Sequence, residues 1–445
     1  MAKNIRLSDH FSYSKLLRFT LPSIVMMVFT SIYGVVDGLF VSNFVGKTAF
    51  ASVNLVMPFV MILGGMGFMT GTGGTALVSK ILGEGDPDTA NRTFSMMVLF
   101  TLALGIVLSA GGIIFMRPVS RFLGATDAMM DDCVLYGRII TGFTFAFMLQ
   151  NVFQSFFIAA EKPKLGLKVT VAAGLTNMVL DALFIAVFNW GVAGAAIATG
   201  LSQCVGGVLP LVYFLRPNSS LLRLSPTRLR LRPILAACGN GSSELMSNIS
   251  SSLVSMLYNF QLMRLAGEDG VSAYGVLMYV QFIFISIYIG YSIGCAPVVS
   301  YHFGAQNHGE LKNLLGKSVL LMGGTGVALT ALVMALADPL SRLFVGYDAG
   351  LFALTSHAFR LFAWSFLLAG FNIYTSGFFT ALNNGGVSAA ISSLRTLVFQ
   401  SASVLILPIF FDVDGIWWAI TVAEVFAFLI SVLFLLAKRG KYHYM

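Results

Sequence analysis

The length and composition of this chain indicate a membrane protein. It has 445 residues, of which 57% are hydrophobic and only 10% are charged, whereas a typical soluble protein has about 25% charged residues. With a mean hydropathy of +0.84, the chain has too few charged groups to cover the surface of two or three soluble domains. The four cysteines form no CxxC motif and no Cys/His cluster, which excludes a disulfide scaffold and gives no sign of a metal centre.

Twelve apolar stretches are long enough to cross a membrane. A helix needs about 20 residues to span a hydrocarbon core about 30 Å thick, and charged residues or Gly, Pro and Asn separate the stretches. The predicted membrane-spanning helices cover residues 19–42, 50–79, 95–116, 134–160, 166–188, 191–215, 234–263, 271–300, 317–337, 354–382, 386–411 and 415–437.

The distribution of basic residues predicts the orientation of these helices. If the N-terminus is cytoplasmic, twenty of the 27 Lys and Arg residues, Lys3 and Arg395 among them, fall in cytoplasmic segments. This asymmetry follows the positive-inside rule and places both termini in the cytoplasm. The net charge of +8 then reflects topology and contact with anionic lipid headgroups. We expect no nucleic-acid partner, because the basic run 223–232 has no aromatic residues between its charges.

The second half of the sequence repeats the first. A shift of 221 residues pairs Gly73 with Gly294 and Gly83 with Gly304, and Ser and Pro residues pair in the same register. Each half contains six predicted spans, and because six is even, both halves enter the membrane from the same side.

The repeat predicts the fold class and the domain organisation. We expect an all-α polytopic membrane protein with twelve transmembrane helices in two parallel six-helix repeats, related by a pseudo-two-fold axis along the membrane normal. The predicted units are an N-lobe of residues 1–215, a cytoplasmic linker of residues 216–233 and a C-lobe of residues 234–445. Substrate is expected to bind between the lobes, and rocking of the lobes would alternate access.

Four acidic residues lie well inside the predicted spans, where a charge costs about 2.5–3.5 kcal/mol and marks function by default. They are Asp37, Asp181, Glu244 and Glu424. Asn177 precedes Asp181 by four residues, so one helix face offers a carboxylate and an amide together. Such oxygen groups suit Na⁺, and the same carboxylates equally suit a proton.

Each of these acids also has a structural alternative. Asp37 or Asp181 could be an interhelical hydrogen-bond partner. Glu244 lies near the inner end of its predicted helix, so it could face a cytoplasmic vestibule, and Glu424 is similar.

Enzyme signatures are missing from the sequence. The five histidines fall in loops, tails or span ends, and no Ser/His/Asp or HExxH arrangement and no P-loop occurs. We therefore expect a protein that is not an enzyme and has no cofactor. Its energy source would be an ion gradient, unless a partner chain supplies ATP hydrolysis.

Several motifs resemble those of the multidrug and toxic compound extrusion (MATE) family, and in particular its bacterial multidrug-exporter-like branch. The resemblance extends along essentially the whole chain. It is carried by Tyr33-Gly-Val-Val-Asp37-Gly-Leu-Phe-Val-Ser-Asn-Phe-Val-Gly46, by Gly73-Gly-Thr-Ala-Leu-Val-Ser79 with its echo at 297–305, and by Asn177-Met-Val-Leu-Asp181-Ala-Leu-Phe-Ile185.

The resemblance implies antiport, in which Na⁺ or H⁺ enters the cell while an organic, often cationic, compound leaves. The implied cation-coupling residues are Asp37, Asn177, Asp181, Gln154 and Thr199, with a possible Na⁺ at Asp37, Asn177, Asp181 and Thr199. Gln154 stands where the family often has Asn, so Asn151, about one turn away, could serve instead. Ala182 replaces a frequent proline, which puts the local bend after Asp181 in doubt.

The resemblance also implies a protein of the bacterial inner membrane, whose partners are small organic substrates and the lipid bilayer. We expect a monomer, because the two lobes supply both walls of the cavity. Candidate residues of the substrate cavity are Tyr33, Asn151, Glu244 and Tyr258. An alternative function is that of a flippase for a lipid-linked precursor, which a basic cavity would favour. The acids inside the spans outnumber the bases, with Arg395 as the one exception, and this argues against an anionic lipid. A membrane-embedded enzyme is a third, disfavoured hypothesis, because no catalytic dyad is visible.

Overall fold

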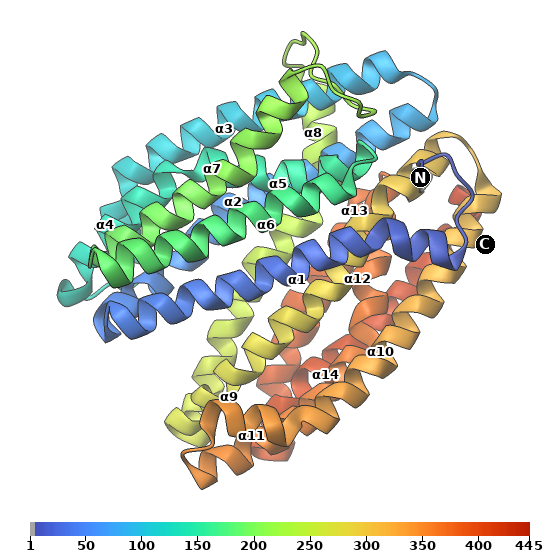
Figure 1. Ribbon diagram of the computed structural model, residues 1–445. Coiled ribbons are helices and arrows are strands. Elements are labelled where there is room, and N and C mark those ends of the chain that lie inside the picture. Colours follow the sequence, from blue (N-terminus) through green and yellow to red (C-terminus); the bar gives the residue numbers. More distant parts are fainter. Residues whose placement is uncertain (1–4) are drawn as a thin grey trace.

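The computed structural model describes residues 5–445, except for the side chains of Ser42 and Lys47. These residues form helices joined by short turns and by one longer non-helical segment, residues 216–230 (Figure 1). Lys3 of the predicted cytoplasmic set lies outside the described residues. The first half comprises α1 (Tyr13–Phe44), α2 (Lys47–Gly83), α3 (Pro87–Phe122), α4 (Asp127–Gly142), α5 (Thr144–Ala159), α6 (Pro163–Asp181), the π-helix η1 (Ala182–Val187) and α7 (Gly191–Leu215). The second half comprises α8 (Leu231–Asn240), α9 (Ser242–Gly304), α10 (His308–Val345), α11 (Ala349–Phe362), the 3₁₀ turn η2 (Ala363–Ser365), α12 (Phe366–Ala381), α13 (Gly385–Ser393), the π-helix η3 (Leu394–Phe399) and α14 (Gln400–Tyr442).

The described helices account for the twelve predicted spans. Nine segments within residues 5–445 are long and apolar enough to cross a membrane, and the pair α4–α5, bent by 50°, adds a tenth. Two of these segments reverse direction and count twice. The first reverses at Gly267, where φ is 65° and the chain of α9 turns back in Figure 1. The second reverses at Asp412, where φ is 48° and Gly415 returns against the backbone of Leu407. The all-α polytopic fold class is confirmed.

Close contacts between glycines and backbone explain why the repeated glycines are needed. A Cβ added to Gly83 would collide with the carbonyl oxygen of Tyr301, and a Cβ added to Gly304 would collide with that of Lys80. Gly83 and Gly304, like Lys80 and Tyr301, are partners in the 221-residue repeat. The two contacts are therefore related by the pseudo-two-fold axis, and only residues without a side chain let the helices approach so closely.

Equivalent helices also begin with equivalent caps. The carboxylate of Asp86 accepts a hydrogen bond from the N–H of Thr89 (3.0 Å) at the start of α3. The amide oxygen of Asn307, its partner in the repeat, accepts one from the N–H of Glu310 (3.1 Å) at the start of α10. Asp and Asn satisfy the free N–H groups of a first helical turn, so the same short turn starts the third span of each half.

The halves meet at the end of the molecule that holds both termini, and this end is called the closed end below. There Gly294 packs against Thr20, and Gly290 packs against the backbone of Ile24. Farther along α1, the rings of Phe29 and Tyr33 pack against Gly174 of their own half instead. The helices of the two halves diverge toward the opposite end, which is called the open end (Figure 1).

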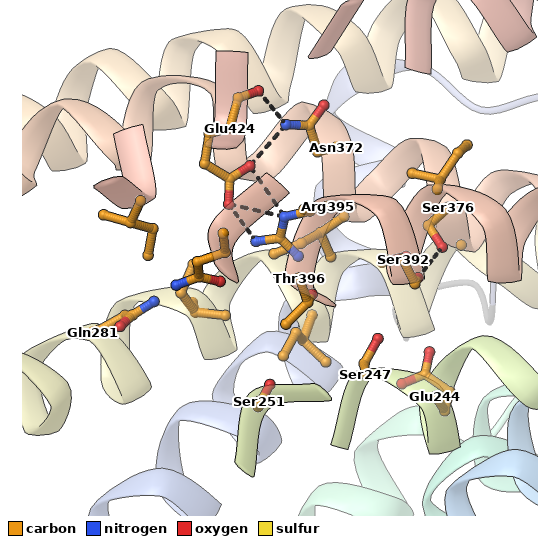
Figure 2. Close-up of a pocket in the computed structure, with 18 of the residues that line it drawn as sticks. Glu244, Ser247, Ser251, Gln281, Asn372, Ser376, Ser392, Arg395, Thr396 and Glu424 are labelled. Carbon is orange, nitrogen blue, oxygen red and sulfur yellow. Dashed lines mark hydrogen bonds and ion pairs between the residues drawn. The ribbon is translucent and has the colours of Figure 1, made fainter. Parts of the chain in front are cut away.

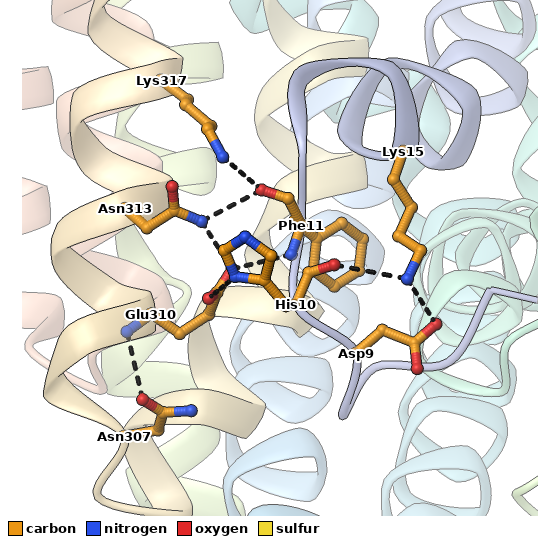
Figure 3. Close-up of polar contacts among 8 residues, drawn as sticks. All are labelled: Asp9, His10, Phe11, Lys15, Asn307, Glu310, Asn313 and Lys317. Carbon is orange, nitrogen blue, oxygen red and sulfur yellow. Dashed lines mark hydrogen bonds and ion pairs between the residues drawn. The ribbon is translucent and has the colours of Figure 1, made fainter.

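Residues 5–12 form a strap across the closed end (Figure 3). The N–H of Leu7 donates to Oε1 of Glu161 in the first half (2.7 Å), and the N–H of Phe11 donates to Oε1 of Glu310 in the second half (2.9 Å). Both Leu7 and Phe11 are fully buried. Nζ of Lys317 donates to the carbonyl oxygen of Phe11 (2.6 Å). The strap therefore connects the two halves through hydrogen bonds and buried side chains.

Burial raises the pKa of Glu161, and the hydrogen bond from Leu7 partly opposes this shift. At the other end of the strap, Nδ1 of His10 lies 2.6 Å from Oε2 of Glu310. Each half thus presents a glutamate to the strap, and both carboxylate oxygens of Glu310 contact strap residues.

Candidate functional site

Four of the predicted coupling residues come together between α1, α6 and α7. Asp37 lies beside Asp181 and Thr199, and within residues 5–445 both carboxyl oxygens of Asp181 and Oδ1 of Asp37 are buried without a hydrogen-bond partner. Nδ2 of Asn177 lies 3.4 Å from Oγ1 of Thr199. Asp181 and Asn177 are buried, and Asp37 is half-buried. Residues from three helices therefore form one polar cluster, which is called the acid pair site below.

The chemistry of this cluster requires a cation or a proton. Among residues 5–445, no Lys, Arg or His forms a salt bridge with Asp37 or Asp181. Two carboxylates in contact repel each other when both are ionised, so one must take up a proton or a positive ion must lie between them. The surrounding oxygens are carboxylate, amide and hydroxyl groups, which are hard ligands suited to Na⁺. The described residues contain no group of three His, Cys, Asp or Glu side chains that could hold another metal.

The helix is distorted directly after Asp181. The π-helical segment η1 begins at Ala182, and the N–H of Phe188 bonds the carbonyl oxygen of Leu183, five residues back (2.9 Å). A π-turn inserts an extra residue into the helix and is frequent at functional sites. The span therefore departs from regular α-helix here although Ala182 replaces the proline.

Two further residues of the acid pair site escaped prediction. The first is Gln150 on α5, which lies beside Tyr33, a predicted residue that is itself near Asp37. Tyr136 on α4 lies near both acids; it is buried, with its hydroxyl 3.6 Å from the sulfur of Met57. Gln150 directly precedes the predicted residue Asn151, and this position in the sequence could have indicated it. Tyr136 is one of 14 tyrosines, and nothing in the sequence distinguishes it from the others.

The predicted amides of α5 have other positions. Asn151 is buried and donates from Nδ2 to the carbonyl oxygen of Gly64 on α2 (3.1 Å). Gln154 is also buried, but among the described residues it forms no hydrogen bond with Asp37 or Asp181. A role for either amide in binding the coupling ion stays a prediction.

The second half contains a cavity of about 200 Å³ (Figure 2). Glu244, Ser247 and Ser251 of α9 form one wall. Arg395 of η3 and Glu424 of α14 lie on the facing wall. This group of lining residues is called the C-half cavity below. Charged and hydroxyl groups line it from several helices, which is typical of a ligand site.

Glu424 is neutralised by its neighbours. Nε and Nη2 of Arg395 lie 2.8 and 2.7 Å from its Oε1, and Nδ2 of Asn372 lies 2.7 Å from its Oε2. The carboxylate is 4% exposed and the Arg395 side chain 21%. A charge-assisted bidentate pair of this kind compensates for the removal of both ions from water.

This geometry corrects one sequence-based assignment. Arg395 was counted among the basic residues of cytoplasmic segments and was also named as the one base inside the predicted spans. It lies within the apolar segment Gly385–Tyr442, which supports the second assignment and not the first. The positive-inside count treats each basic residue by itself, and it fails here because the carboxylate of Glu424 solvates the guanidinium inside the span. Asn372 was not predicted, since an amide in a long apolar helix has no charge to mark it.

The predicted substrate residues divide between the halves. Tyr33 and Asn151 belong to the first half, whereas Glu244 lines the C-half cavity. Tyr258 is buried and stacks on Tyr274 with ring centroids 4.8 Å apart, and within residues 5–445 its hydroxyl has no hydrogen-bond partner. The structure therefore does not gather the four residues into one pocket.

Comparisons with known proteins agree with this architecture. The sequence matches the family described as MatE over residues 22–183 and 245–403, which is more than half of the chain. The multidrug export protein MepA of Staphylococcus saprophyticus is 22% identical over 443 residues, covering 96% of this chain and 94% of the relative. Two solved structures superpose with a TM-score of 0.93 over 100% of both chains: MATE in complex with MaL6 (20% identity), and the outward-facing conformation of a multidrug resistance MATE family transporter of the MOP superfamily (21% identity). These structures share the fold of this chain.

Proposed function

Because this chain belongs to the MatE family, we propose that it is a secondary active transporter that exports small organic, often cationic, compounds in exchange for Na⁺ or H⁺. The name of the staphylococcal relatives, multidrug export protein, supports this substrate class. The observation that carries the coupling proposal is the acid pair site, where Asp37 and Asp181 meet without a basic partner. The protein would need no resident cofactor and would have no enzymatic activity.

The acid pair supplies a way to couple an ion to a change of shape. Asp37 lies on α1 and Asp181 on α6, so a bound cation or proton draws these two helices together. When the ion leaves, the two charges repel each other and the helices separate. Ion and substrate then compete for, or alternately occupy, the first half around these acids. Only a difference in affinity between the two shapes is required for coupling.

Alternating access would proceed by movement of two lobes, residues 1–215 and 234–445, joined by a cytoplasmic linker of residues 216–233. With both termini in the cytoplasm, the closed end faces inward and the open end faces outward. Inward opening would have to separate the glycine contacts at Gly83 and Gly304 and release the strap. We propose a monomer in the bacterial inner membrane, because both walls of the C-half cavity come from one chain.

Flippase activity on an anionic lipid-linked precursor has less support. Such a substrate needs unpaired positive charge inside the membrane, but Glu424 neutralises Arg395. The acid pair site adds two acids and no base. The named activity of the sequence relatives also points to drug export.

Counterflow in proteoliposomes tests the proposed function. Purified protein is reconstituted, a Na⁺ or pH gradient is imposed, and movement of a labelled organic cation is followed. We expect one of the two gradients to drive export, and we expect Asp37→Asn and Asp181→Asn each to reduce it to background while protein stays in the membrane. Glu268→Gln, which removes an exposed charge at the open end, is the matched control. Full export by both acid variants would overturn the assignment.

A further inference from the structure

The C-half cavity has an unbalanced charge. Its lining contains two carboxylates, Glu244 and Glu424, and one guanidinium, that of Arg395. Arg395 and Glu424 neutralise each other at 2.7 Å. Glu244 lies on the opposite wall (Figure 2) and forms no salt bridge within residues 5–445. One negative charge therefore remains, and a single positive charge on a ligand balances it.

The same cavity also has a free hydrogen-bond donor. Arg395 uses Nε and Nη2 to bind Glu424, and Figure 2 shows its remaining Nη1 without an interaction among the residues drawn. A guanidinium has five N–H donors in a planar fork, so its outer edge can bind a further acceptor. Because Glu424 neutralises the guanidinium, Nη1 offers a hydrogen bond without net attraction for an anion.

From these two features we propose that the C-half cavity binds monocationic organic ammonium compounds that carry a neutral hydrogen-bond acceptor, and that the Arg395–Glu424 pair sets this charge selectivity. Glu244 binds the ammonium, and Nη1 of Arg395 donates to a carbonyl or ether oxygen on the other side of the ligand. This inference rests on the proposed export function, since it names the class of compound that this half of the transporter selects.

The proposal makes a specific claim about zwitterions. An ammonium compound with a carboxylate brings no net charge, so the cavity keeps its excess negative charge and the ligand carboxylate lies near that of Glu424. The zwitterion therefore binds more weakly than its ester. Glu424→Gln changes this balance, because the amide oxygen still accepts from Arg395 while the positive charge of the guanidinium is no longer neutralised. Ammonium and carboxylate then each find an opposite charge, on Glu244 and Arg395, and the preference reverses.

Three matched probes test the claim on the purified full chain in detergent at pH 8. They are the quaternary ammonium ester methyl 4-(trimethylammoniomethyl)benzoate, its zwitterionic free acid, and benzyltrimethylammonium, which has no acceptor. Equilibrium binding of the tritium-labelled probes measures the affinities. We expect the ester to bind the natural protein about tenfold more tightly than the acid and several-fold more tightly than benzyltrimethylammonium.

The variants assign the selectivity to particular residues. In Glu424→Gln we expect the acid to bind more tightly than the ester. In Glu244→Gln we expect the ester to lose about tenfold in affinity; this residue has no described salt-bridge partner, so its loss leaves no charge unpaired and folding is retained. In Arg395→Lys the charge on Glu424 stays balanced, but the planar fork is lost, so the advantage of the ester over benzyltrimethylammonium shrinks. Glu268→Gln serves as the control and leaves all three affinities unchanged.

Three results overturn the proposal: equal affinities of ester and acid for the natural protein, ester binding that is unaffected by Glu244→Gln, or a folded Glu424→Gln variant that still prefers the ester. The binding measurement needs no ion gradient, so it separates this proposal from the proposed function. If Asp37→Asn/Asp181→Asn retains the charge selectivity but the natural protein fails in counterflow, the cavity assignment stands and the export function falls. If counterflow succeeds and the selectivity is absent, export stands and the cavity assignment falls.

Discussion

The two halves of this protein treat a buried acid in opposite ways. In the first half, Asp181 meets a second acid, Asp37, and no base is near. In the second half, Glu424 meets Arg395 and Asn372. An acid paired with an acid depends on a positive charge from outside, whereas an acid paired with a base is complete within the protein. The first arrangement suits the binding and release of an ion, and the second suits a permanent, mutually neutralised part of the cavity lining.

The scaffold around these different sites is shared. Gly83 and Gly304 make equivalent backbone contacts, and a π-helical segment follows Asp181 in one half and contains Arg395 in the other. The acids do not follow the repeat: Asp181 corresponds to Ser403 at an offset of 222 residues. Symmetry in the contacts between helices therefore coexists with different chemistry inside each half.

The largest effect on stability is expected when the Arg395–Glu424 pair in the second half is broken. Arg395→Ala leaves the buried Glu424 without its counter-charge and should lower the free energy of unfolding by about 3–5 kcal/mol. Thermal unfolding of the detergent-purified protein measures the loss. The double variant Arg395→Met/Glu424→Leu, which removes both charges, should recover most of the stability. A stable Arg395→Ala variant would show that the pair does not neutralise a buried charge.

The shared scaffold can be tested with the glycines at the closed end. Gly83→Ala and Gly304→Ala each place a methyl group against a backbone carbonyl, and each should cost about 1–3 kcal/mol of stability. Because the contacts are related by the repeat, the two losses should be similar. Gly316→Ala and Gly323→Ala in α10 are matched controls, since a Cβ there meets only open space. Losses that differ by more than twofold would argue against equivalent contacts.

The helix caps give the smallest expected effect. Asp86→Ala and Asn307→Ala each remove one hydrogen bond from the first turn of α3 or α10, and each should cost about 1 kcal/mol. Chemical denaturation followed by circular dichroism can resolve a difference of this size. Asp88→Asn, which leaves the cap itself unchanged, is the control for α3. A loss at only one of the two caps would limit the symmetry to the glycine contacts.

Much of the fold could be predicted from the sequence, because hydrophobic length and charge asymmetry are local properties. The twelve spans, the repeat and the closeness of Asn177 to Asp181 on one face follow from spacing alone. The helices extend beyond the apolar stretches; α3, for example, runs from Pro87 although its apolar core begins near residue 95. Polar residues at helix ends are solvated and carry no hydropathy signal, so these bounds could not be placed.

The interactions that complete each site could not be predicted in the same way. Gln150, Tyr136 and Asn372 are uncharged, and many residues of their types occur in the chain. Arg395 carries a signal, but its position depends on Glu424, 29 residues later and on another helix. Such pairs exist only once the helices are packed, so spacing along one helix cannot reveal them.

Ion flux driven by substrate tests the central claim, that Asp37 and Asp181 bind the coupling ion. Proteoliposomes loaded with an organic cation would be diluted into substrate-free buffer, and the movement of ²²Na⁺ or of protons would be recorded. We predict ion movement opposite to the substrate in the natural protein and none in Asp181→Asn. Ion flux that persists in the Asp37→Asn/Asp181→Asn variant would contradict the claim.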